Sequence, residues 1–165
     1  YALFGGGYDG VYSRSNVDAY DEELTHTTPD SLNNNSRSLA AASTGAHAIF
    51  AGGLYFSTYL SGVSIYDLSL TKTSPSLALS QARFNLSATS INSRAIFGGG
   101  KSQSGYSATV DVYNSELTRT TPTELSVARN DLSATTVGEY ALFGGGQINN
   151  SSTATNIVDV YTVKE

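Results

Sequence analysis

The sequence predicts an all-β fold made of a repeated unit, on three observations. A motif that ends in two or three glycines occurs four times along the 165 residues, at positions 1–7, 47–53, 94–100 and 140–146. The phenylalanines inside these motifs are separated by 46, 47 and 46 residues. Each motif is followed by a stretch in which apolar and polar residues alternate, the pattern of a strand with two distinct faces. A period of this length is typical of the blades of a β-propeller.

Each unit is predicted to form four short antiparallel strands, lettered a to d from the inner edge of a blade. Strand a is the Ser- and Thr-rich segment before the glycine motif, and strand b is the apolar and aromatic part of that motif. Strand c carries the alternation that residues 110–113 illustrate. Glycine or Asn-Ser turns separate a from b, and glycine pairs end b. Prolines lie near the expected start of strand d, at Pro29, Pro75 and Pro122.

The repeat units divide at about residues 1–46, 47–93, 94–139 and 140–165, the last being partial. The chain opens in strand b and stops in strand c, so the expected order is b-c-d, a-b-c-d, a-b-c-d and a-b-c. This order predicts a propeller arc of about three and a half four-stranded repeats with unpaired edges at both ends. We expect the ring to be completed by further sequence or by another copy of the chain, with a dimer as the simplest homo-oligomer.

The repeated positions resemble those of the kelch family. An Arg occurs early in the first strand, at Arg37, Arg83 and Arg129. A glycine pair ends the second strand, at Gly5/Gly6, Gly52/Gly53, Gly98/Gly99 and Gly144/Gly145. A tyrosine lies in the third strand, at Tyr20, Tyr66, Tyr113 and Tyr161. The family's following Trp is replaced by Thr27, Thr73 and Thr120. The near-identical copies also resemble kelch-type repeats of bacterial and phage surface or tail-associated proteins, which implies an extracellular or virion-associated location.

Composition argues against several classes of partner and cofactor. With 14 acidic and 9 basic residues, the chain offers no basic stripe for nucleic acid. No apolar run approaches the length of a membrane helix, so no membrane partner is expected. The two histidines, His26 and His47, occupy different repeat positions, and cysteine is absent, so no metal site and no cofactor are expected. Residues 5–10 satisfy G-x-G-x-x-G, but a strand pattern follows where a nucleotide-binding helix is needed.

The segments between strands b and c vary while the surrounding frames are nearly copied. These loops span residues 8–15, 54–62, 101–109 and 147–156 and are rich in Tyr, Ser, Gly and Asn, the composition of an adaptable binding surface. Because strands alternate in direction, the b–c loops and the d–a connections are expected on one face. We therefore predict a noncatalytic module that binds a protein or a glycan. The alternatives are a carbohydrate-active enzyme of the kelch or sialidase-like propeller class, and a structural tile that assembles with itself.

The expected ligand-binding residues are aromatic and arginine side chains of this face. They are Tyr8, Tyr12, Arg14, Arg37, Tyr55, Phe56, Tyr59, Arg83, Tyr106 and Arg129. The arginines that recur with the repeat have a second possible role, which is to order neighbouring backbone. The recurring carboxylates Asp18, Asp111 and Asp159 are expected to be structural acceptors, and no catalytic residue is expected.

Overall fold

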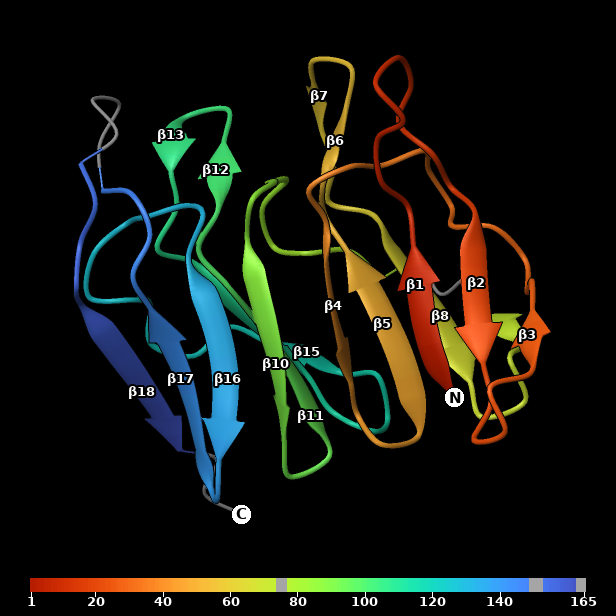
Figure 1. The fold of residues 1–165 in the computed structure, drawn as a ribbon. Helices are drawn as coiled ribbons and strands as arrows, with labels where there is room; N and C mark the ends of the chain where they lie inside the picture. The colour runs from red at the N-terminus through yellow and green to blue at the C-terminus, as the bar shows by residue number, and fades with distance from the viewer. Residues whose placement is uncertain (74–76, 149–152, 163–165) are drawn as a thin grey trace.

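The computed structural model describes residues 1–73, 77–148 and 153–162, and these form an all-β fold of small antiparallel sheets (Figure 1). The first sheet contains β1 (Ala2–Gly5), β2 (Val17–Tyr20) and β3 (His26–Thr27). The second contains β4 (Ala40–Ser43), β5 (His47–Ala51), β8 (Val63–Asp67) and β9 (Lys72–Thr73). The third contains β10 (Ser87–Ile91), β11 (Arg94–Gly98), β14 (Val110–Tyr113) and β15 (Arg119–Thr120). The fourth contains β16 (Ser133–Val137), β17 (Tyr140–Gly144) and β18 (Val158–Thr162).

Two further hairpins lie within the loops that were predicted to vary. One pairs β6 (Leu54–Tyr55) with β7 (Thr58–Tyr59), and the other pairs β12 (Lys101–Ser102) with β13 (Gly105–Tyr106). Each of the four larger sheets is built from strands that are consecutive in the repeat, so each sheet is formed by one continuous part of the chain. The prediction of an all-β chain is confirmed.

The fourth strand of the repeat lies earlier in the sequence than predicted. The two-residue strands β3 and β15 end before Pro29 and Pro122, whereas the prediction put these prolines near the start of the strand. A proline has no N–H for the strand ladder, so it ends the pairing here. Pro75 lies outside the described residues.

Successive sheets lie side by side and bury apolar clusters between them. Strand β10 contacts both β4 and β16, and Figure 1 shows these strands in a row. Each cluster joins the Val-rich third strand of one sheet to an aromatic pair on the next, as Val63 of β8 shares a cluster with Phe97 and Tyr113. The clusters therefore bind neighbouring sheets together.

The aromatic pair is the most regular part of this packing. The rings of Phe97 and Tyr113 meet edge to face with centroids 5.9 Å apart, and the same arrangement recurs in all four sheets. The Tyr113 hydroxyl donates a hydrogen bond to the Ala78 carbonyl at 2.8 Å, as Tyr66 does to the Asp30 carbonyl at 2.6 Å. Burial is the main cause that raises the pKa of Tyr66 to about 12. Packing with a satisfied hydroxyl is the role expected for these two tyrosines.

Two buried ion pairs tie the segment that precedes a sheet's first strand to the third strand of the same sheet. Arg83 Nη2 lies 2.8 Å from Asp111 Oδ2, and both side chains are fully buried. Arg129 Nη2 lies 2.7 Å from Asp159 Oδ2 and also donates to the Phe143 carbonyl at 2.9 Å. Burial lowers the pKa of Arg83, and the Asp111 charge offsets part of that effect. Burial opposes the ionisation of Asp159, but hydrogen bonds from Ser126 and the Arg129 charge outweigh it and lower the pKa.

In the segment that leads into the second sheet, the position equivalent to Arg83 and Arg129 is Ser36, not Arg37 as the sequence alignment had it. The carbonyl at this position accepts a hydrogen bond from the last glycine of the motif in the preceding sheet. The three bonds are Gly7 N to Ser36 O at 2.8 Å, Gly53 N to Arg83 O at 2.9 Å, and Gly100 N to Arg129 O at 2.8 Å. The alignment on residue identity was therefore displaced by one position.

In the second sheet, serine stands at both positions of the ion pair. Ser64 stands opposite Phe50 in the strand register, as Asp111 stands opposite Phe97. Ser64 Oγ accepts a hydrogen bond from the Asn33 backbone N–H at 2.8 Å, and Ser36 Oγ donates to the Gly52 carbonyl at 3.0 Å. In the ion pair, Asp111 likewise accepts from a backbone N–H and Arg83 likewise donates to a backbone carbonyl. The two serines therefore make the same kinds of backbone hydrogen bond without the two charges.

Candidate ligand-binding surface

The loops between the second and third strands gather at one end of the sheets. In Figure 1 the hairpins β6–β7 and β12–β13 and the loop that follows β1 project from the same end. The connection from the first sheet to the second runs between two of these loops, because Ser36 N donates to the Arg14 carbonyl at 2.9 Å and Arg37 N donates to the Leu54 carbonyl at 3.1 Å. Segments far apart in the sequence thus form one surface.

The first loop is shaped by the side chain of Asp9. One oxygen of this carboxylate accepts hydrogen bonds from Val11 N at 2.9 Å and from Tyr12 N at 2.7 Å, while the other pairs with Arg14. These backbone hydrogen bonds, with a smaller contribution from Arg14, lower the pKa of Asp9 to about 2. Arg14 is therefore engaged within the loop, and its guanidinium carbon lies 5.8 Å from the centre of the Tyr12 ring.

The Asp9 turn is expected to persist well into the acidic range. The pKa of Asp9 is depressed from 3.8 to about 2 in the folded chain. The ionised carboxylate therefore supports the turn fully above pH 3.8, and this support is lost as the pH falls through about 2. Nuclear magnetic resonance should show the Val11 and Tyr12 amides shifting with that midpoint, and an Asp9→Ala variant should lack the transition. A midpoint at or above 3.8 would contradict the turn described here.

The hairpin β6–β7 carries aromatic side chains to the adjoining edge of this surface. The Tyr55 and Phe56 rings meet at 4.6 Å between centroids, and Phe56 is largely exposed at its tip. Tyr59 instead packs against Phe84, with centroids 5.3 Å apart. The hairpin therefore presents Tyr55 and Phe56 outward and anchors itself through Tyr59.

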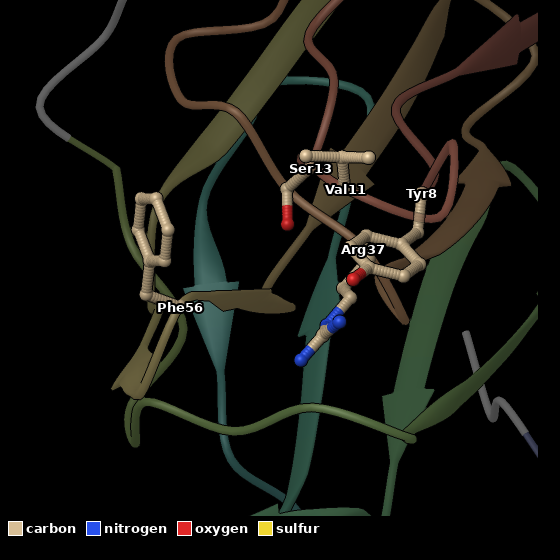
Figure 2. Close-up of a pocket in the computed structure, with 5 residues that line it drawn as sticks. All are labelled: Tyr8, Val11, Ser13, Arg37 and Phe56. Atoms are coloured by element: carbon tan, nitrogen blue, oxygen red, sulfur yellow. The ribbon is translucent and has the colours of Figure 1, made fainter.

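Between these two loops lies a pocket of about 100 Å³ (Figure 2). Its lining residues are Tyr8, Val11, Ser13, Arg37 and Phe56. The Arg37 guanidinium carbon lies 4.5 Å from the centre of the Tyr8 ring, a distance typical of a cation–π contact. Figure 2 shows Phe56 on the side opposite Arg37, with Ser13 between them.

Arg37 differs from the other arginines of the predicted site. The Arg83 and Arg129 side chains are fully buried in ion pairs and do not reach the loop surface. Each also donates a hydrogen bond to a backbone carbonyl, which fits the second role considered for them, the ordering of neighbouring backbone. Arg14 pairs with Asp9. Among the described residues, no carboxylate lies within ion-pairing distance of Arg37. Arg37 is thus a half-buried cation that lines a pocket and has no carboxylate partner in the part of the chain that the structure describes.

The structure brings together only part of the predicted site. Tyr8, Arg37 and Phe56 share the pocket, whereas Tyr106 lies on the hairpin β12–β13, beside Lys101. Val11 and Ser13 also line the pocket and were not singled out, because an aliphatic and a small hydroxyl residue in a loop carry no sequence signal of their own.

Within the part of the chain that the structure describes, no three His, Asp or Glu residues are grouped so that they could hold a metal ion. No helix in these residues could span a membrane. No protein-family model matches the chain, and no curated protein matches it.

Proposed function

We propose that this chain is a noncatalytic recognition module, an arc of a kelch-like β-propeller whose loop face binds a partner protein. The observation that carries this proposal is the pocket in which Arg37 lies on Tyr8, with no carboxylate partner among residues 1–73, 77–148 and 153–162. The proposal extends to a location outside the cell or on a virion, which stays a prediction from the style of the repeats.

The chemistry of the pocket favours an anionic group. The chain has a net charge of −5, and no carboxylate of the described residues lies within ion-pairing distance of Arg37. A guanidinium that stacks on an aromatic ring keeps its N–H edge available, and that edge matches a carboxylate in a two-pronged hydrogen bond. The Ser13 hydroxyl and the Phe56 ring supply a polar and an apolar wall.

The size of the pocket favours one side chain of a protein over a separate small molecule. Sites for small molecules usually enclose about 300–1,000 Å³, and this pocket encloses about 100 Å³. Tyr, Phe and Arg are enriched in the cores of protein interfaces, where a few anchored side chains dominate the affinity. An Asp or Glu of the partner seated against Arg37, with Tyr55 at the edge of the contact, fits these features.

The proposal is tested by selecting ligands for the intact chain from a random-peptide display library and from an array of neutral and carboxylated oligosaccharides. Selected peptides should contain Asp or Glu, and amide replacement of that residue should abolish binding. Arg37→Gln should weaken binding by about 10- to 100-fold, the cost of losing a charge-assisted pair. Arg37→Lys should restore only part of it, since lysine lacks the planar fork.

Arg94→Gln is the matched control, because Arg94 opens β11 at the turn opposite the loop hairpins (Figure 1). It should leave binding unchanged, and neither substitution should alter the circular dichroism spectrum or the melting temperature. Equal affinities of the two variants, or peptides without any acidic preference, would contradict the proposal. If the chain bound carboxylated oligosaccharides and no peptide, the partner would be a glycan and the proposal of a protein partner would be wrong.

A further inference from the structure

The two end sheets expose apolar faces that are buried everywhere else in the repeat. Phe4 of β1 is 63 % exposed, whereas its equivalents Phe50, Phe97 and Phe143 are 5 %, 0 % and 0 % exposed. We call the side of the first sheet that carries Phe4 the leading face. At the other end, Val158 and Val160 of β18 are 53 % and 56 % exposed. We call the side of the fourth sheet that carries these valines and Gly144 the trailing face.

The internal junctions show what covers each kind of face. Val110 and Val112, the third-sheet equivalents of the trailing-face valines, are buried in one cluster with Phe143 of the fourth sheet. In the same way Val17 of the first sheet is buried with Phe50 of the second. A trailing-type face is thus covered by the phenylalanine of a leading-type face in each case.

At two of the three internal junctions a glycine makes room for that phenylalanine, and at the third, between the second and third sheets, the position is the small residue Ala51. A Cβ atom on Gly98 would lie 2.8 Å from the Phe143 ring, and one on Gly5 would lie 2.9 Å from the Phe50 ring. Gly144 holds the same position in the fourth sheet, yet a Cβ there would meet only Val158 of its own sheet, at 3.5 Å. The trailing face therefore has an open slot of the shape that receives a phenylalanine inside the molecule.

We propose that two copies of this chain associate head to tail, with Phe4 of one copy packed over Gly144 and against Val158 and Val160 of the next. The two faces are complementary to each other and not to themselves, since one presents a ring and the other a slot. The contact is therefore heterologous, and repetition gives a closed ring or a filament. This association is independent of the ligand proposed for Arg37.

Light scattering after size exclusion, run on the intact chain from micromolar to millimolar concentration, tests the proposal. The mass should rise with concentration. Phe4→Glu alone, or Val158→Glu with Val160→Glu, should hold the chain as a monomer, because each places a charge in the contact. An equimolar mixture of the two variants should give a species of two chains, since one unmodified leading face meets one unmodified trailing face. Leu68→Glu, at an exposed turn on neither face, should associate like the parent chain.

A second measurement does not depend on how well the charged variants fold. The chain contains no cysteine, so Phe4→Cys in one population and Val160→Cys in another should form a mixed disulfide dimer only where the two faces meet. A parent chain that stays monomeric throughout, or a mixture of the charged variants that does not associate, would overturn the proposal. Cross-linking within each single-cysteine population at the same rate as between them would also overturn it.

Discussion

Replacing Asp111 by Ser is expected to destabilise the protein by about 3–5 kcal/mol, and replacing Arg83 by Ser in the same chain is expected to recover part of that loss. The single substitution leaves the Arg83 guanidinium fully buried and removes the carboxylate that lies 2.8 Å from it. Arg119, whose Nε lies 3.7 Å from the same carboxylate, also loses a partner. The cost comes mainly from an uncompensated buried charge.

The chain itself contains the double replacement. Ser36, which precedes β4, and Ser64, in β8, occupy the two positions of the second sheet, and each hydroxyl has a backbone partner. A buried ion pair replaced as a whole is often tolerated, whereas removal of one partner is not. The double variant still loses the volume of the arginine side chain, so it is expected to lie between the parent and the single variant in stability.

Urea unfolding of the parent, both single variants and the double variant measures this coupling as a double-mutant cycle. Asp9→Ser and Arg14→Ser form the control cycle at an exposed ion pair, where the coupling should be much smaller than at Arg83 and Asp111. Additive losses at Arg83 and Asp111 would show that the two charges do not depend on each other, contrary to the geometry.

The strands were predictable because their signal is local. A period of 2 in the third strand and the glycine turns are properties of a few adjacent residues, and the structure has strands at those segments. The outermost strand was misplaced because it is only two residues long, too short for an alternating pattern. The roles of Tyr66 and Tyr113 were also predictable, since an aromatic residue that recurs with the repeat must lie in equivalent packing.

The pocket and the register of the arginines were not predictable in the same way. Tyr8, Arg37 and Phe56 come from three segments, and only tertiary structure brings them together. Arg37 was aligned with Arg83 because both are arginine, whereas the backbone hydrogen bonds place Ser36 there. The alignment by residue identity failed in the second sheet, where serines stand in place of the ion pair. Arg37, one residue beyond the equivalent position, is the arginine that lines the pocket.

Replacing Gly99 by Val is expected to cost more than about 4 kcal/mol, enough to leave little folded protein. Gly99 has a φ of +69°, and a Cβ atom there would lie 2.7 Å from the Arg129 carbonyl oxygen. That oxygen cannot move freely, because Gly100 N donates to it at 2.8 Å and the Arg129 side chain is held by Asp159. Strain of the backbone and overlap with a fixed carbonyl therefore add.

Gly138→Val is the matched control that separates these two contributions. Gly138 has a φ of +54°, and a Cβ there would have nothing within 4 Å, so only the backbone strain of about 1–3 kcal/mol applies. Thermal and urea unfolding of both variants should show a much larger loss at Gly99. Equal losses would mean that the Arg129 carbonyl yields to the new side chain. The close approach of Gly99 to the Arg129 carbonyl of the next sheet would then contribute little to holding the sheets together, and the conformation of the turn alone would explain the glycine.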